Sequence, residues 1–138
     1  MKYYAVIDTN VVVSALLKEN SLPWQILNLI VEGKIIPIFN EEILGEYKDV
    51  LTRNKFGFSE TNVAMTISLI KDFGQKMEPI EILEKFIDEK DIVFYQIVMS
   101  ARQTQESYLV TGNIKHFPKK KFIVTPFEML DIIKKNSP

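Results

Sequence analysis

The chain has 138 residues, of which 46% are hydrophobic and 25% are charged; this suits one globular domain over residues 1–138 and excludes a disordered chain. It contains no cysteine, which excludes a disulfide framework, thiolate metal ligands and a cysteine nucleophile. The formal net charge of -1 means that any nucleic-acid partner has to be attracted by a local patch and not by the overall charge.

The start of the chain predicts strands that alternate with helices. Residues 2–7 form a β-branched and aromatic run typical of a buried strand, and residues 9–17 have the small and aliphatic side chains of a helix. A helix over 22–34 and a short strand over 35–39 are expected next. Pro37 places that strand near an edge of the sheet or makes it irregular.

The clearest helical stripe follows Asn40, a natural N-cap for a helix over 40–56. Its inward-facing residues are Ile43, Leu44, Tyr47, Val50 and Leu51. Another helix is expected within 59–76, where Ser59 caps its start and Gly74 marks its end.

The remaining elements complete an alternating order. They are, along the chain, a short strand and a loop over 77–91, a helix buried on several sides over 91–105, strands over 107–113 and 122–126 separated by a basic loop over 114–121, and a helix over 126–135 begun by Thr125. Strands alternating with helices predict an α/β fold, in which helices wrap a parallel sheet.

Polar residues end two of the predicted strands. Asp8 directly follows the first strand, and the Thr-Gly-Asn of 111–113 ends a later one. Ligands of open parallel sheets bind outside the carboxyl ends of the strands, so the two stretches can face one pocket. The alternative for Asp8 is an N-cap of the following helix, and its position alone does not decide between the two.

Two further acids lie where a helix meets the core. Glu46 lies at the border of a buried helical face. It is a candidate site residue, and the alternative interpretation is a boundary residue whose carboxylate lies in solvent. Asp91 opens the mostly apolar helix, whereas Asp88, one turn earlier, is interpreted as a cap. Burying a carboxylate such as that of Asp91 is costly unless a cation or strong hydrogen bonds compensate.

Convergence of Asp8, Glu46 and Asp91 would create strong repulsion, about 4 kcal/mol per pair at a separation of about 4 Å and an effective dielectric of about 20. No basic residue is evident inside these motifs to offset it. A hard divalent cation would offset it, and oxygen ligands suit Mg²⁺ or Mn²⁺. Such an ion can activate water for attack on a phosphate.

Four segments, in this order, resemble the PIN-domain family of metal-dependent ribonucleases, and in particular the toxin components of toxin–antitoxin systems. The segments are AVIDTNVVVSALL, EEILGEYKDVLTR, DEKDIVFYQIVMSA and SYLVTGNIKHFPKKKFIVTPFEML, and the likeness covers essentially the whole chain. The resemblance implies a three-layer α/β/α PIN-like domain with a central, mainly parallel sheet.

The resemblance also implies which residues form the site. Asp8, Glu46 and Asp91 match the acids that bind Mg²⁺ or Mn²⁺ in the family. Asn113 stands where many relatives have a fourth acid, and it completes the catalytic set without adding charge. Three further residues match positions that support the acids: Thr9 and Asn10 beside the first acid and Thr111 at the end of the later strand.

The implied activity is hydrolysis of RNA phosphodiester bonds by a metal-activated water, which leaves a 3′ hydroxyl and a 5′ phosphate. Four lysines of the basic loop are expected to hold the RNA backbone, with a solvated loop as the alternative: Lys115, Lys119, Lys120 and Lys121. His116 is expected to contact phosphate or to lie at the surface, and not to act as a base. Trp24, Phe56 and Phe58 are expected to belong to the core and not to stack on bases.

The resemblance implies three partners: the RNA substrate, an antitoxin protein and a second copy of the chain in a homodimer. No apolar run reaches the roughly 18 residues of a spanning helix, and the opening stretch lacks a small-residue cleavage site. We therefore expect a cytoplasmic protein without a membrane segment.

Three classes of protein are alternatives to a nuclease. A haloacid-dehalogenase phosphatase also has an aspartate after its first strand, but Asn10 replaces its second acid. A receiver domain needs paired acids that are absent here. The third class is a PIN-like module that binds RNA or a partner with weak or no catalysis, which Asn113 keeps open. The three acids argue against this module, because clustered negative charge repels RNA.

Overall fold

A parallel five-stranded sheet forms the centre of the computed structural model, which describes residues 1–137. The strands are β1 (Tyr3–Ile7), β2 (Ile35–Phe39), β3 (Gln75–Lys76), β4 (Ser107–Val110) and β5 (Ile123–Val124). They lie in the order β3-β2-β1-β4-β5, and the neighbouring strands pair in parallel. The predicted α/β fold with a parallel sheet is therefore confirmed.

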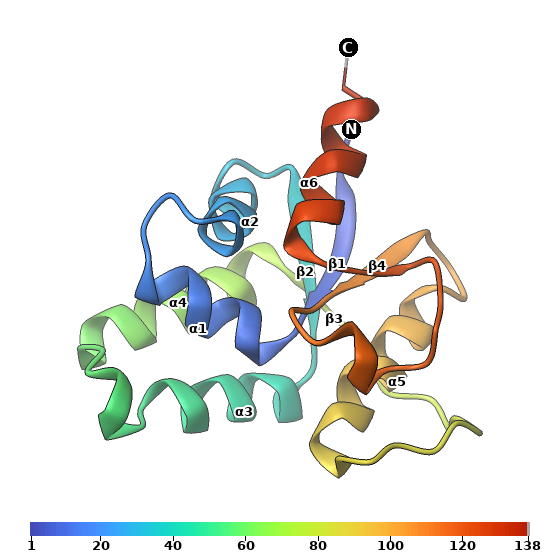
Figure 1. Cartoon of the computed structure of the whole chain (residues 1–138), viewed down its shortest axis with the longest axis horizontal. Coiled ribbons are helices and arrows are strands. Elements are labelled where there is room, and N and C mark those ends of the chain that lie inside the picture. Colours follow the sequence, from blue (N-terminus) through green and yellow to red (C-terminus); the bar gives the residue numbers. More distant parts are fainter. Residues whose placement is uncertain (138) are drawn as a thin grey trace.

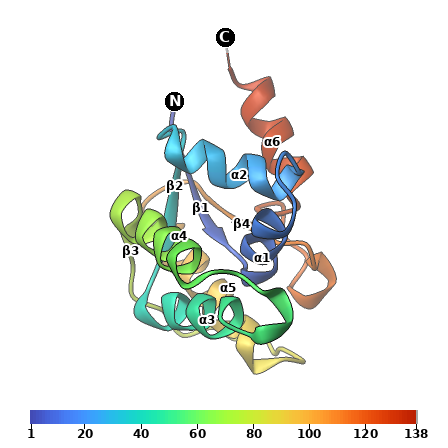
Figure 2. The same ribbon diagram turned by 90° about the vertical axis from the view of Figure 1, so that its left-hand side faces the viewer.

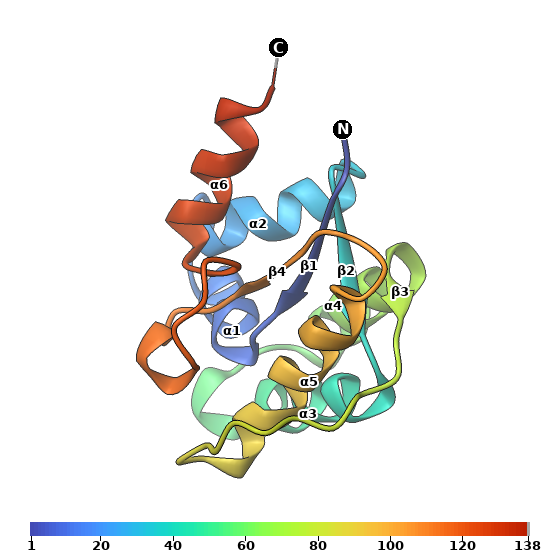
Figure 3. The same cartoon turned by 90° about the vertical axis from the view of Figure 1, so that its right-hand side faces the viewer.

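Helices cover both faces of this sheet. They are α1 (Thr9–Leu17), α2 (Leu22–Val31), α3 (Glu41–Leu51), α4 (Glu60–Phe73), α5 (Ile92–Ala101) and α6 (Pro126–Lys135), with 3₁₀ turns η1 (Asn54–Phe56), η2 (Glu89–Asp91) and η3 (Ile114–His116). In Figure 1, α1, α2 and α4 lie to the left of the strands and α5 lies to the lower right. Figures 2 and 3 show the same layers from the two sides, with α2 and α4 in front in Figure 2 and α5 in front in Figure 3. No helix of residues 1–137 is both long enough and apolar enough to cross a membrane.

Side-chain caps that the sequence predicts begin three of the helices. The side chains of Asn40, Ser59 and Thr125 each accept a hydrogen bond from a backbone N–H in the first turn of α3, α4 and α6. Because a cap satisfies an N–H that the helix itself leaves unpaired, these polar residues define where each helix starts. All three starts are as predicted.

The core centres on β1 and α5. Ala5, Val6 and Ile7 of β1 are fully buried, and seven of the ten residues of α5 are buried, as its apolar circumference predicts. Tyr47 of α3 is also fully buried, and its hydroxyl donates a hydrogen bond to the carbonyl oxygen of Ile7. This bond fixes α3 against the carboxyl end of β1, where the next residue is Asp8.

One predicted element is wrong. The short strand expected within 77–91 is absent from that range, and β3 lies just before it. Phe86 packs its ring against Tyr95 of α5 and Phe117, at centroid distances of 5.4 and 5.9 Å. Side-chain contacts therefore anchor this irregular stretch, in which Pro79 also removes a backbone donor.

Pro37 lies beside the edge of the sheet, as expected. It is opposite Ala5 of β1, whereas β3 pairs with β2 only at the two residues after it, Ile38 and Phe39. Pro37 therefore has a paired strand, β1, on one side, and the short β3 does not reach it on the other side. The missing N–H of Pro37 costs no hydrogen bond to β3.

Gly74 joins α4 to β3 at a point too crowded for a side chain. A Cβ there would lie 2.4 Å from the carbonyl oxygens of both Ile70 and Pro37. We expect Gly74→Ala to lower the free energy of unfolding by about 3 kcal/mol in a urea titration, because backbone has to move. A Cβ at Gly45, on the open side of α3, would meet no atom of residues 1–137 within 4 Å, so Gly45→Ala should raise the free energy of unfolding by about 0.5–1 kcal/mol. A Gly74→Ala protein as stable as the wild type would contradict this close approach.

Candidate functional site

A pocket of about 330 Å³ opens beside the carboxyl end of β1. The chain leaves β1 for β2 on one side, while β4 lies on the other side, so the strand order reverses here. Such a reversal is the place where open α/β sheets bind ligands. We call this hollow the acid pocket, and its charged lining residues are Asp8, Glu46, Arg53, Asp88, Lys90 and Asp91.

Asp8 is buried at the end of β1, with 5% of its surface exposed. It occupies the N-cap position of α1, but its side chain makes no capping hydrogen bond to residues of the described chain. Instead its Oδ2 accepts hydrogen bonds from Thr111 Oγ1 at 2.7 Å and from Asn10 Nδ2 at 3.0 Å. The capping interpretation of Asp8 is therefore wrong.

The pKa of Asp8 is raised above its ordinary value. Burial is the largest cause, because it disfavours the charged form, and the charge of Asp91 adds to it. The hydrogen bonds from Thr111 and Asn10 oppose the rise. Asp8 is thus a carboxylate that the fold holds in place at an electrostatic cost.

Thr111 and Asn10 connect the ends of the two neighbouring strands. Thr111 Oγ1 also accepts a hydrogen bond from the Asn113 backbone N–H at 3.0 Å, and Asn10 Oδ1 accepts one from the Gly112 N–H at 3.0 Å. A Cβ on Gly112 would lie 3.3 Å from Asn10 Oδ1, so this approach favours glycine. The loop after β4 is thereby fastened to the start of α1, around Asp8.

Glu46 reaches the acid pocket from α3. Its Oε2 accepts a hydrogen bond from Thr9 Oγ1 at 2.5 Å. Burial raises the pKa of Glu46, the Thr9 hydroxyl opposes the rise, Asp8 adds to it, and Lys90 lowers it. The resemblance placed Thr9 beside the first acid as its brace, whereas the Thr9 side chain bonds the second acid.

Asp91 enters the pocket from the end of η2. Its side chain exposes 15% of its surface and makes no cap bond to α5, while His116 Nδ1 lies 3.4 Å from Asp91 Oδ2. The pKa of Asp91 is raised by burial and by the charge of Asp88, and His116 lowers it. Asp88 does cap η2, through the Lys90 N–H at 3.0 Å, but it also lines the pocket, which the cap interpretation missed.

The other predicted site residues lie outside the acid pocket. Asn113 is exposed and lines a neighbouring hollow with Lys115 and His116. The run of three lysines, Lys119, Lys120 and Lys121, is exposed on the loop between η3 and β5. His116 connects the two regions, because it lines the neighbouring hollow and contacts Asp91.

Two cationic residues that were not predicted at the site line the acid pocket. Arg53 and Lys90 both line it, contrary to the expectation that no basic residue accompanies the acids. The available signals were short separations along the chain, since Arg53 comes two residues after the end of the helix that carries Glu46, and Lys90 adjoins Asp91.

The donor chemistry of the pocket fits a hard divalent cation, because carboxylate oxygens are the ligands that Mg²⁺ and Mn²⁺ prefer. Within residues 1–137, however, no three acidic or histidine side chains are placed closely enough to hold one ion together. Asp8, Glu46 and Asp91 each have a partner of their own in Thr111, Thr9 and His116. The acids share one pocket, and they are not gathered around one point.

Without metal, the Asp91 carboxylate is expected to destabilise the fold at neutral pH. Its pKa is raised above the ordinary Asp value of about 3.9, so the folded chain binds the proton more tightly than the unfolded chain does. The free energy of unfolding therefore falls as the pH rises through this raised pKa.

Asp91→Asn removes that loss. In urea unfolding with EDTA, the stability of this variant relative to the wild type should increase from about pH 4 to about pH 7. Asp72→Asn, which changes an exposed carboxylate of α4 outside the pocket, is the control. A constant difference across this range would contradict the prediction.

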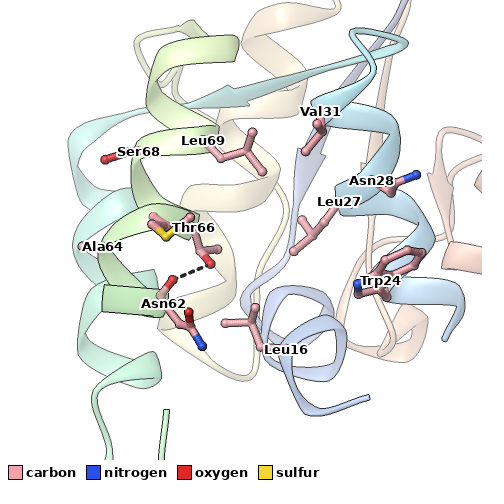
Figure 4. Close-up of a pocket in the computed structure, with 11 residues that line it drawn as sticks. Leu16, Trp24, Leu27, Asn28, Val31, Asn62, Ala64, Thr66, Ser68 and Leu69 are labelled. Atoms are coloured by element: carbon pink, nitrogen blue, oxygen red, sulfur yellow. Dashed lines mark hydrogen bonds between the residues drawn. The ribbon is translucent and has the colours of Figure 1, made fainter. Parts of the chain in front are cut away.

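A larger hollow, of about 730 Å³, lies between α2 and α4. Figure 4 shows Leu27 and Leu69 facing each other across it, with Leu16 nearby. No residue lining it carries a titratable side chain, so this apolar groove offers nothing for acid–base or metal chemistry. The smaller acid pocket is therefore the candidate active site.

A comparison with known families agrees with this architecture. The family model described as PIN domain matches residues 4–115, whereas no curated protein matches the chain. The matched residues include all of β1 except Tyr3, the strands β2 to β4 and the acid pocket, and β5 and α6 extend the same structure beyond them. PIN domains are generally nucleases, and the chain belongs to the PIN domain family.

Proposed function

We propose that the chain is a metal-dependent endoribonuclease that hydrolyses RNA phosphodiester bonds, with Mg²⁺ or Mn²⁺ as its cofactor. The observation that carries the proposal is that Asp8, Glu46 and Asp91, from three separate parts of the chain, line one pocket at the strand-order reversal. Burial raises the pKa of each of them, a pattern that is frequent at active sites.

Asp8 and Asp91 would hold the divalent ion directly, and Glu46 would hold it through a water. When bound, it would supply charge stabilisation at the phosphate and a water with a lowered pKa. Thr111 and Asn10 orient Asp8 through its Oδ2. The proposal keeps Asn113 as a supporting group of the catalytic set, next to the pocket, and keeps the loop lysines as contacts to the RNA backbone.

In this proposal Glu46 acts as the proton acceptor. Thr9 donates to its Oε2, so Oε1 remains for the water that attacks phosphorus. The water gives a proton to Glu46, and its oxygen forms a bond to phosphorus as the bond from phosphorus to the 3′ oxygen breaks. The leaving 3′ oxygen takes a proton from solvent water. The products are then a 5′ phosphate and a 3′ hydroxyl.

The proposal is tested with a fluorescent single-stranded RNA and the purified chain in Mg²⁺, in Mn²⁺ and in EDTA. We expect internal cuts in either metal and none in EDTA, with a phosphate on the 5′ end of the downstream product. A folded protein that leaves the RNA uncut in both metals would contradict the proposal.

A second candidate is a PIN-like module that binds RNA or a protein partner without cutting. It is favoured by the separation of the acids, which form no three-membered ligand group in residues 1–137, and by Asn113 in place of an acid. Such a module would bind the same RNA equally well with metal and with EDTA, and it would leave the RNA intact in both.

We also propose that the chain is the toxin of a toxin–antitoxin pair, binds an antitoxin protein and forms a homodimer. The resemblance of four ordered segments supports these three points. Expression of a ribonuclease toxin arrests the growth of a bacterial host, and light scattering distinguishes the mass of a monomer from that of a dimer. Growth without arrest by a chain that cuts RNA in vitro would contradict the toxin role and leave the nuclease standing.

A further inference from the structure

The acid pocket has to accept a polyanion although four carboxylates line it. Asp8, Glu46, Asp88 and Asp91 face a phosphodiester with the wrong charge, so attraction has to come from cations beside them. In the lining of this pocket, those cations are Arg53 and Lys90. Their position, and not the overall charge of the chain, favours binding of a phosphate next to the acids.

Arg53 is free to change partners at little cost. It follows α3, exposes 43% of its side chain, and forms an ion pair of 3.5 Å with Asp49, which is still more exposed. Exposed pairs of this kind contribute little to stability. A guanidinium can therefore turn from Asp49 to a phosphate, which it can bind through two parallel hydrogen bonds.

Lys90 is the second cation of the acid pocket. It lies in η2, and in the sequence it stands between Asp88 and Asp91, two acids of the pocket. Its backbone is held by the Asp88 side chain, and its ammonium lowers the pKa of Glu46. Lys90 lines the acid pocket together with these carboxylates, and the residue remains exposed. This gives the pocket a second cation, on a different element from Arg53.

An aromatic ring, that of Phe56, also lines the acid pocket. Phe56 of η1 is half-buried and lines the pocket, and its ring is nearly parallel to that of Phe58, 10° apart at 5.6 Å. Gly57, with φ of +67°, turns the chain between them. Lys55 Nζ lies 5.1 Å from the Phe56 ring centre. The expectation that Phe56 is only a core residue is therefore incomplete.

We propose that Arg53, Phe56 and Lys90 form the subsite that holds single-stranded nucleic acid beside the scissile phosphodiester. Arg53 and Lys90 bind neighbouring phosphates, and the Phe56 ring contacts the unpaired base between them, as aromatic rings do in single-strand-binding proteins. This inference rests on the proposed nuclease function. The exposed lysines at 119–121 lie outside the acid pocket and add only general attraction.

The test measures binding without cleavage, by fluorescence anisotropy of a labelled single-stranded RNA of mixed sequence in EDTA. We expect Arg53→Gln and Lys90→Gln each to weaken binding about tenfold, a typical loss for a charged hydrogen bond. Each should also reduce the slope of log K against log salt by about 0.7, the value for one phosphate on a single strand. Lys71→Gln, on α4 and outside the pocket, is the matched control.

The aromatic contact is tested with Phe56→Leu, which keeps an apolar side chain, against Phe58→Leu, which changes the ring that does not line the pocket. Phe56→Leu should weaken binding about tenfold, within the range for loss of one stacked base. An RNA with one abasic position at the contacted site should bind this variant and the wild type equally. Single-stranded DNA and duplex RNA of the same sequence identify which nucleic acid the subsite accepts.

The outcomes separate this inference from the nuclease proposal. RNA binding that depends on the three residues, in a protein that never cuts, supports the subsite and contradicts the nuclease. Cutting by a protein whose binding is unchanged in all three variants, or is lost only when lysines 119–121 are replaced, overturns the subsite and leaves the nuclease in place. Binding of duplex RNA in preference to single strands also overturns it.

Discussion

Replacing Asp8 by asparagine is expected to lower RNA cleavage about a thousandfold and to leave the chain folded. Metal assistance contributes several kcal/mol to the stabilisation of the transition state, and about 4 kcal/mol corresponds to a thousandfold in rate. Asp8 is the most deeply buried of the three proposed ligands, and an amide cannot replace its charge.

The fold should tolerate Asp8→Asn because both hydrogen bonds reach one oxygen. Thr111 and Asn10 donate to Oδ2 of Asp8, and the amide oxygen of asparagine can accept both. The substitution also removes a buried charge, so the free energy of unfolding in EDTA should not decrease.

Initial rates of cleavage at saturating Mn²⁺, together with urea unfolding, check both parts of the prediction. Asp72→Asn on α4 should cut as fast as the wild type. An Asp8→Asn protein that retains more than a tenth of the activity would show that Asp8 is not a ligand in the reaction.

Thr111→Val is expected to lower activity between about tenfold and a hundredfold, the usual effect of removing a group that orients a metal ligand. The Thr111 hydroxyl donates to Asp8 and accepts from the Asn113 N–H, and no part of the residue is exposed. Valine keeps the shape of the side chain and removes both bonds. The free energy of unfolding should fall by about 2 kcal/mol, because buried polar groups lose their partners.

The measurement has to distinguish orientation of Asp8 from general damage. Thr111→Ser retains the hydroxyl and should recover most of the activity, and Thr111→Val should need more Mn²⁺ for half-maximal cleavage. Metal binding followed by calorimetry gives the same comparison without cleavage. Equal metal affinity of Thr111→Val and the wild type would contradict the orienting role.

Helix starts and strands were predictable because their signals are local. Asn40, Ser59 and Thr125 each bond to the helix turn that follows them, so the sequence around each residue contains both partners. The stretch 77–88 behaves differently, because its path depends on the packing of Phe86 against α5 and Phe117. No periodic pattern of residues within 77–88 indicates this packing.

The sequence by itself determined the alternating order of strands and helices, the parallel sheet, and the position of Asp8 at a strand end. These follow from the periodicity of apolar residues and from connections that suit parallel strands. The tertiary structure alone decided which group each acid binds. Thr111 is 103 residues from Asp8 and Thr9 is 37 residues from Glu46, and they meet because β4 and α3 pack beside β1. Arg53 and Lys90 share the acid pocket for the same physical reason, since strand order and helix packing set distances that spacing along the chain does not.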